Sequence, residues 1–413
     1  MLNRFFSRSV IITGAAVVAV FAAPSSSHAN SDVRSRKTSL SSPDVSTTSS
    51  TATASGPTSP PLNVNSGPPP LASGIIDMIG NTPLVELRSL SKATGRRILA
   101  KCEFLAPGGS VKDRAALYLI RAAEADGRLS PGGTVIEATG GNTGVALAAI
   151  AAAKGYKCIL TVPPTTSEEK VSLARSMGAR VEVCANVPFG DPLHYYARAA
   201  TLAAETAGGV WLDQFENPAC ALCHYETTGP EILAQVGSRG IDGVCLAAGT
   251  GGTIGGIAPA LRKANSNLRV FLIDPPGSSL ASLVNSGDLI VTPGTTINEG
   301  VGIGRLTRNF KTALDEGKIE SAFIGDDQEV VDMAAFLLRR EGLFVGPSAA
   351  LNVCGVVKAA RLLPAGSTLV TVLCDSGARY GSKLWKPDGG LWLAERGLAI
   401  SNSVKEGGLP FVS

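Results

Sequence analysis

The sequence predicts an α/β protein in which parallel sheets are covered by helices on both faces. From about Ile75 onwards, short apolar strand-like segments alternate with helical segments, which is typical of parallel sheets. Hydrophobic residues make up 44% and charged residues 17% of the 413 residues, and the 47 glycines suit an enzyme with buried strands and many turns. In such sheets, ligands bind at the carboxyl ends of the strands.

The expected strands are short apolar runs bounded by polar or turn residues. They are Arg97–Phe104, Gly133–Ala138, Tyr156–Val162, Val181–Cys184, Val210–Asp213, Gly243–Ala247, Val270–Ile273 and Leu369–Leu373. Helices are expected between them, including Val145–Lys154, which Gly155 ends, and Ile254–Leu261. Thr166 is expected to start another helix, with Glu169 completing a capping box.

The first 70 residues are expected to direct the protein to its location and to contain no catalytic residue. Residues 1–30 contain Arg4 and Arg8, no acidic residue, and an apolar run that is short for a membrane span. They fit a targeting or anchor segment, either a mitochondrial presequence, a secretory signal or a short membrane anchor, and the sequence does not decide whether they are cleaved. Residues 31–70 are rich in Ser, Thr and Pro, so we expect a disordered linker.

Charge and cysteine usage narrow the class of protein. The first 70 residues hold five Lys/Arg and two Asp/Glu, so the remainder holds 32 of each, and a neutral body argues against a nucleic-acid partner. Most of the eight cysteines lie in apolar runs, which favours reduced thiols and an intracellular compartment. Cys220–His224 matches the spacing of c-type haem attachment, but nothing else in the sequence supports haem. No cysteine pairs have zinc-site spacing, so no metal site is expected.

A lysine that follows a glycine-rich turn is the first candidate for chemistry. Lys112 lies in the segment Gly108–Arg114 and precedes an apolar helical run. A lysine is costly to hold in a partly buried cleft unless its amine has a task, and one such task is a Schiff base to an aldehyde cofactor. The alternative is a solvated lysine in the first turn of a helix, and this segment alone does not exclude it.

Two glycine-rich loops join strands to helices and are candidates for ligand binding. Gly249–Thr253 would cradle a phosphate with converging backbone N–H groups and a helix amino terminus. It lacks the pattern of a nucleoside triphosphate or dinucleotide site. Thr139–Gly144 would present amides and polar side chains to a carboxylate. A tight turn without a ligand is the alternative for both, and Glu299–Gly304 is expected to be a loop near a ligand.

Several ordered motifs carry a family resemblance. They are Ile79–Val85, Ser110–Arg114, Gly141–Gly144, Gln214–Phe215, Thr227–Ile232, Gly249–Thr253 and Cys374–Tyr380. Over about residues 74–400 the sequence resembles the cysteine synthase (O-acetylserine sulfhydrylase) family of pyridoxal-phosphate enzymes, in a branch with bacterial and fungal members, including mitochondrial fungal ones. The resemblance implies two doubly wound domains with parallel sheets, the tryptophan synthase β-like architecture of fold type II.

The resemblance also implies domain bounds and a role for each motif residue. A catalytic region at 71–405 would contain a smaller domain at about 106–217 and a larger one at about 75–105 plus 218–400. Lys112 would form the Schiff base with pyridoxal 5′-phosphate and act as general base, and Ser348 would face the pyridine nitrogen. The other cofactor-binding residues would be Asn142, Gly249, Thr250, Gly251, Gly252 and Thr253. The residues that receive the substrate carboxylate would be Thr139, Gly140, Asn142, Thr143 and Gln214.

The implied reaction is the replacement of acetate in O-acetyl-L-serine by sulfide, which gives L-cysteine. The resemblance further implies a homodimer, and the sequence does not decide whether a serine acetyltransferase binds at the mouth of the active site. Residues 1–30 are expected to give a mitochondrial location, in the matrix or anchored to a membrane, with secretory or plastid targeting as the alternative. The family's carboxylate loop usually reads Thr-Ser-Gly-Asn-Thr, and Gly140 takes the place of the serine. Cystathionine β-synthase or another β-elimination or β-replacement on a serine-type substrate therefore remains an alternative. A non-catalytic, membrane-anchored relative is the third reading.

Overall fold

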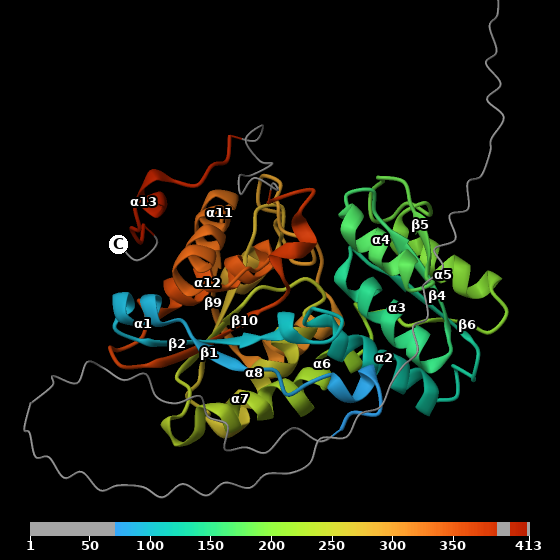
Figure 1. The fold of residues 1–413 in the computed structure, drawn as a ribbon, viewed down its shortest axis with the longest axis horizontal. Coiled ribbons are helices and arrows are strands. Elements are labelled where there is room, and N and C mark those ends of the chain that lie inside the picture. Colours follow the sequence, from blue (N-terminus) through green and yellow to red (C-terminus); the bar gives the residue numbers. More distant parts are fainter. Residues whose placement is uncertain (1–70, 386–396, 411–413) are drawn as a thin grey trace, which may run out of the picture. The chain divides into compact units, whose positions relative to one another are not determined.

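The computed structural model describes residues 71–385 and 397–410, and these contain two β-sheets (Figure 1). The larger sheet has the strand order β1-β2-β10-β7-β8-β9, and all neighbours are parallel except the antiparallel pair β1 and β2. Its strands are β1 (Leu84–Glu86), β2 (Arg97–Cys102), β7 (Gly243–Leu246), β8 (Arg269–Asp274), β9 (Ile319–Ile324) and β10 (Thr368–Leu373). The smaller sheet, of order β5-β4-β3-β6, is parallel throughout. It contains β3 (Thr134–Ala138), β4 (Lys157–Val162), β5 (Arg180–Val183) and β6 (Gly209–Trp211).

Helices follow most strands, as the alternating pattern predicts. The α-helices in the described part of the chain are α1 (Arg88–Thr94), α2 (Lys112–Ala125), α3 (Asn142–Lys154), α4 (Glu168–Ser176), α5 (Tyr195–Glu205), α6 (Ala219–Cys223), α7 (Gly229–Val236), α8 (Gly252–Ala264), α9 (Leu280–Ser286), α10 (Arg308–Thr312), α11 (Asp327–Phe336), α12 (Pro347–Ala360) and α13 (Asn402–Lys405).

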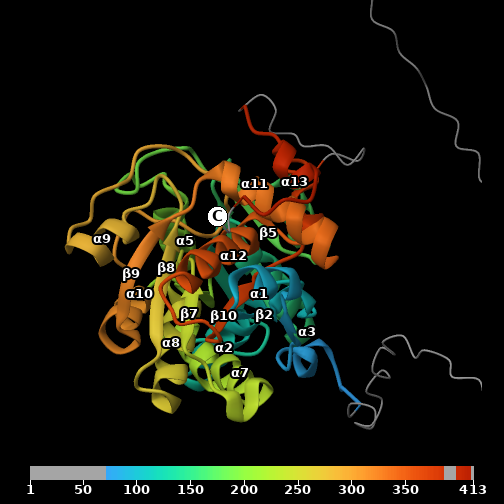
Figure 2. The same cartoon turned by 90° about the vertical axis from the view of Figure 1, so that its left-hand side faces the viewer.

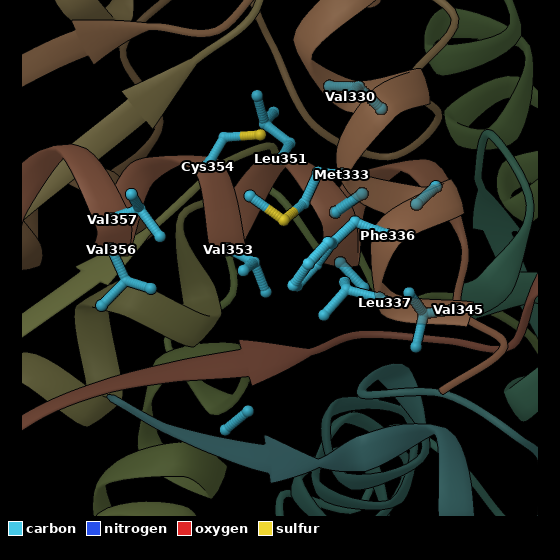
Figure 3. Packing of buried hydrophobic residues seen from close by; sticks show 14 of the residues in the cluster. Val330, Met333, Phe336, Leu337, Val345, Leu351, Val353, Cys354, Val356 and Val357 are labelled. Carbon is cyan, nitrogen blue, oxygen red and sulfur yellow. The ribbon is translucent and has the colours of Figure 1, made fainter. Parts of the chain in front are cut away.

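The larger sheet is buried on both faces because alternate residues of its strands enter different apolar cores. In β8, Phe271 and Ile273 belong to the core that contains α11 and α12, whereas Val270 and Leu272 belong to the core that contains α7 and α8. Figure 3 shows the first of these cores, where Met333 and other side chains of α11 lie beside those of α12. The smaller sheet repeats the arrangement: Val135 packs in the core of α2 and α3, and the next residue packs with α5. The predicted α/β class is confirmed.

All eight expected strands are present, and two further strands were missed. β1 has three residues at one edge of the larger sheet, and β9 at the other edge has no fully buried residue, so neither has the apolar run that marks a buried strand. Helix α3 starts at Asn142, three residues before the expected Val145. It starts there because Gly141, at φ +144°, turns the chain directly from the loop into the helix.

The predicted capping box at Thr166 and Glu169 is wrong. Helix α4 begins at Glu168, its N-cap is Ser167, and no side chain caps it. Glu169 instead accepts hydrogen bonds from the backbone N–H and the hydroxyl of Ser382, the latter at 2.6 Å, so a distant segment competes successfully for the carboxylate. The pattern that predicted the cap is local, whereas the contact that replaces it is tertiary.

The carboxyl-terminal segment packs on α11. The backbone N–H of Ser401 donates to Asp332 at 2.7 Å, and Gln328 donates to the carbonyl of Ala399. Figure 2 shows α13 beside α11. Within residues 71–385 and 397–410, no helix is long and apolar enough to cross a bilayer. The predicted targeting segment (1–30) and linker (31–70) lie outside the described residues.

Candidate active site

A cavity of about 190 Å³ lies where loops from the carboxyl ends of strands of both sheets meet. Four segments contribute to its lining. They are the lysine loop, which runs from the end of β2 to Lys112, the carboxylate loop at 139–144 after β3, the glycine loop at 249–253 after β7, and the first turn of α12. Every site residue expected from the sequence lines it except Gly252. The structure thus brings together residues that are more than 200 positions apart in the chain.

Lys112 is the first residue of α2 and is half-buried at the cavity wall. Its loop is held to the end of β10, because the backbone N–H of Val111 donates to the carbonyl of Cys374 at 2.8 Å. In the described part of the chain no ion pair involves Lys112. The buried amine of Lys101, by contrast, lies 2.7 Å from Glu231 and donates to the carbonyl of Thr82. The Lys112 amine is therefore left available for chemistry in the cavity.

The helix that carries Lys112 is anchored by a buried ionic network. Arg114, 2% exposed, lies 2.9 Å from Glu103 of the lysine loop and 2.6 Å from Glu231 of α7. Burial opposes ionisation of Glu231, but hydrogen bonds from Arg114 and Lys101 outweigh it and lower the pKa of Glu231 to about 2. Burial raises the pKa of the neighbouring Asp113 to about 6, although a hydrogen bond from the N–H of Gly108 opposes this. The network ties the first turn of α2 to α7 and to the end of β2.

The carboxylate loop presents donors at the amino terminus of α3. No side chain caps α3, so its first N–H groups are open to a ligand. The Thr143 hydroxyl donates to Gln214 at 2.7 Å, and the Gln214 amide donates one N–H to the carbonyl of Ala138 at 2.7 Å. Thr143 thus orients Gln214, whose second N–H has no protein acceptor among the described residues. A Cβ at Gly140 would meet no atom within 4 Å, so the missing serine leaves open space.

The glycine loop after β7 turns into α8, which has no side-chain cap either. Gly251 is the N-cap, at φ +84°, and a Cβ there would lie 2.4 Å from the backbone nitrogen of Phe310. Gly252 is not among the cavity-lining residues, and a Cβ there would lie 2.8 Å from the carbonyl oxygen of Cys220. These glycines are required by close packing, and the helix terminus beside them has the positive potential that suits an anion.

Ser348 is buried in the first turn of α12 at the far wall of the cavity. Its neighbour Cys374 has a pKa raised to about 12 by burial and by the charge of Asp375, so the thiol stays protonated. Asn352 holds this wall in place, because it accepts from the N–H of Ala247 at 2.6 Å and donates to the carbonyl of Val372 at 2.8 Å. The wall therefore offers neutral groups and no carboxylate to a ring nitrogen.

The sequence analysis missed several residues of the lining. Lys170, Tyr195, Asn352 and Cys374 line the cavity, as does Glu299, for which the sequence predicted only a loop near a ligand. Cys374 belongs to the motif Cys374–Tyr380 and Glu299 to the glycine-dense loop at 299–304, whereas the local sequence around Lys170, Tyr195 and Asn352 carried no signal, because these residues reach the cavity through tertiary packing.

The cysteine pair at 220 and 223 is structural. Both thiols are buried in α6, and burial raises their pKa values. His224 is buried as well, and burial lowers its pKa, so the imidazole is neutral. Its Nδ1 lies 2.8 Å from the Thr228 hydroxyl. Among the described residues, no cluster of His, Cys, Asp and Glu has the arrangement of a metal site.

These groups fit pyridoxal phosphate. An unpaired lysine amine suits its aldehyde, an uncapped helix terminus beside a glycine loop suits its phosphate, and a buried hydroxyl suits its ring nitrogen. A second uncapped helix terminus, at α3, suits the carboxylate of an amino acid.

Comparison with known proteins agrees with this chemistry. The family model described as pyridoxal-phosphate dependent enzyme matches residues 75–375. Cysteine synthase 1 of Emericella nidulans is 44% identical over 328 residues, which cover 79% of this chain and 87% of that protein. A Saccharomyces cerevisiae protein provisionally named a mitochondrial cysteine synthase is 42% identical, over 76% of this chain and 84% of that protein. The crystal structure of an O-acetylserine dependent cystathionine β-synthase from Helicobacter pylori has a TM-score of 0.67 at 32% identity, and covers 76% of this chain and 98% of that one.

Proposed function

The chain belongs to the pyridoxal-phosphate-dependent enzyme family, and from this premise we propose that it is a cysteine synthase that converts O-acetyl-L-serine and sulfide into L-cysteine and acetate. The observation that carries the proposal is the Lys112 amine, which has no ion-pair partner among the residues that the structure describes and lines the same cavity as the uncapped amino termini of α3 and α8. The likeness to cysteine synthases over most of the chain supports the choice of reaction.

We propose the following assignment of the binding groups. Lys112 would hold the cofactor covalently. The loop from Gly249 to Thr253 and the amino terminus of α8 would hold its phosphate, Asn142 would face its phenolic oxygen, and Ser348 would face its ring nitrogen. The amides of the 139–144 loop and the free N–H of Gln214 would hold the substrate carboxylate. Once bound, pyridoxal phosphate supplies an electron sink next to the substrate Cα.

The residues of the chain divide the reaction between them. Once the substrate amine has displaced the Lys112 amine, the Lys112 amine acts as the base that removes the proton from Cα. The bond from Cβ to oxygen then breaks, acetate leaves with the electron pair, and the sulfur of hydrosulfide forms the new bond to Cβ. The protonated Lys112 returns its proton to Cα. The Ser348 hydroxyl does not protonate the ring nitrogen as a carboxylic acid would, which favours loss of the proton and of acetate in close succession.

Two measurements test this function. Purified protein given O-acetylserine and sulfide should produce cysteine, and Lys112→Ala should abolish both the product and the visible absorption of the bound cofactor. A variant that retains absorption but loses turnover would contradict the covalent role of Lys112. A wild-type protein that binds the cofactor and makes no cysteine would contradict the reaction.

A second candidate is cystathionine β-synthase activity. It is favoured by Gly140, which departs from the usual carboxylate loop, and by the likeness to an enzyme named as an O-acetylserine dependent cystathionine β-synthase. Incubation with O-acetylserine or serine plus homocysteine separates the two, because only this activity forms cystathionine. If the protein forms more cystathionine than cysteine at equal substrate concentrations, cystathionine β-synthase activity becomes the first proposal and cysteine synthase activity the second.

We also propose a cellular context and a domain division. Residues 1–30 would direct the protein to mitochondria, which the likeness to the yeast protein supports. The catalytic region would be a homodimer that binds serine acetyltransferase, with the smaller domain at about 106–217. Fractionation of cells, together with the mass of the mature amino terminus, tests the mitochondrial location. Light scattering of the purified protein tests the oligomeric state.

A further inference from the structure

The motif Asp375–Tyr380 follows β10 and has no role in the mechanism above, yet two of its side chains contact Asn142. The Asn142 amide nitrogen lies 2.7 Å from Oδ2 of Asp375, and its oxygen lies 2.7 Å from a guanidinium nitrogen of Arg379. Asn142 starts α3 and lines the cavity, whereas the motif lies 233 residues further along the chain. The contact thus joins the loop after β3 to the loop after β10.

The chemistry of the two partners allows only one orientation of the Asn142 amide. An ionised carboxylate only accepts hydrogen bonds, so it requires the amide nitrogen. A guanidinium only donates, so it requires the amide oxygen. Rotation of the amide by half a turn would set two acceptors against each other at Asp375 and two donors against each other at Arg379. Without such partners an asparagine amide has two orientations of similar energy.

Both partners are themselves held in place. Asp375 is fully buried, and its Oδ2 also accepts from the Tyr380 hydroxyl at 2.8 Å. The backbone N–H of Gly346 donates to the Asp375 carbonyl at 3.0 Å. Arg379 donates to the carbonyl of Gly108 in the lysine loop, and a Cβ at Gly109 would lie 2.6 Å from its guanidinium. Neither partner can turn away without breaking these contacts.

We infer that Asp375 and Arg379 are positioning residues that fix which end of the Asn142 amide faces the cofactor. The inference rests on the proposed function. One N–H of Asn142 is used by Asp375, whereas the second has no protein acceptor in the part of the chain that the structure describes, and Asn142 lines the cavity. A donor at this place stabilises negative charge on the phenolic oxygen of the cofactor, whereas the amide oxygen would repel it. The electronic state of the cofactor then depends on two residues that do not touch it.

The test uses the absorption spectrum of the purified holoenzyme, which reports the cofactor independently of turnover. The spectrum of Asn142→Ala shows the change that follows loss of the Asn142 N–H donor, and it serves as the reference for the other variants. Asp375→Asn has the same shape as Asp375 but can donate as well as accept, so the orientation of the Asn142 amide then rests on Arg379 alone, and we expect a smaller spectral shift in the same direction. Arg379→Gln should do the same, whereas Arg379→Lys, which remains only a donor, should restore more of the wild-type spectrum. Ser376→Ala is the matched control, because its hydroxyl accepts only from the backbone of Ala378.

The double variant decides whether the partners act through Asn142. In the Asn142→Ala background, Asp375→Asn and Arg379→Gln should cause no additional spectral shift. A wild-type spectrum in both single variants would overturn the inference, as would a shift that simply adds to that of Asn142→Ala. If Asp375→Asn does not fold, the variants Arg379→Gln and Arg379→Lys test the inference in its place. A failure of the proposed function looks different, since the wild-type protein would then bind no cofactor or make no cysteine.

Discussion

The Lys170 amine lies 2.5 Å from Oε2 of Glu299, and this ion pair joins helix α4 to the glycine-rich loop that follows α9. Both side chains line the cavity, and they are only 1% and 11% exposed. Lys383 contacts the other carboxylate oxygen of Glu299, and the Lys170 amine lies 4.1 Å from the centre of the Tyr380 ring. One carboxylate therefore pairs with two lysines, of which Lys170 lines the cavity.

Removal of this carboxylate should destabilise the protein more than removal of a surface one. Glu299→Gln leaves the buried Lys170 amine without a counter-charge, and we expect the free energy of unfolding to fall by about 3 kcal/mol. Asp315→Asn is the control, because it breaks the exposed pair with Lys311 and should cost less than about 0.5 kcal/mol. Urea unfolding measures both, and equal losses would show that the Glu299 pair is not desolvated in solution.

Serine at position 140 should improve binding of the amino-acid substrate. The open space around Gly140 admits the side chain, and its hydroxyl would add a donor for the carboxylate. A hydrogen bond to a charged group contributes about 1.5–3 kcal/mol, so the KM for O-acetylserine should fall by roughly tenfold or more. Gly140→Ala separates the hydroxyl from the added carbon. If Gly140→Ala lowers KM as much as Gly140→Ser does, the hydroxyl does not contact the carboxylate.

Alanine at position 251 should abolish cofactor binding. Gly251 has φ +84°, which costs an L-residue about 1–2 kcal/mol, and its Cβ would also overlap the backbone of Phe310. The loop would have to move away from α10, which shifts the amino terminus of α8. Equilibrium dialysis of the purified variant against pyridoxal phosphate measures the loss. Gly190→Ala, at a position with open space around it, should bind the cofactor as the wild type does.

Stability should fall in acid because of Glu231. Its pKa is about 2 in the folded protein and 4.5 ordinarily, so the folded state binds the proton more weakly than the unfolded chain. The resulting stabilisation is complete above about pH 4.5 and is lost as the pH falls towards 2. The difference corresponds to about 3 kcal/mol. Glu231→Gln should be less stable at pH 7 and should show a smaller loss between pH 5 and pH 3 in denaturant titrations. An unchanged pH dependence would mean that another group controls acid unfolding.

Much of the fold and of the site follows from local patterns in the sequence. The buried strands were predictable because each is a short apolar run between turn residues, whereas β9 was missed because its residues stay half exposed at a sheet edge. Lys112 and the glycine loops were predictable because each lies at a strand-to-helix junction. The capping box at Thr166 failed because Ser382, over 200 residues away, holds the Glu169 carboxylate.

Local patterns in the sequence were enough to predict the α/β class and to single out Lys112 and the two glycine-rich loops as candidates, because helix and strand periodicity and glycine turns act between near neighbours in the chain. The partners of Asn142, the carboxylate that pairs with Lys170 and the packing of Gly252 against Cys220 appear only in the three-dimensional structure. These contacts depend on how strands far apart in sequence align their carboxyl ends. That alignment is set by packing of the two sheets against their helices, which no local spacing encodes.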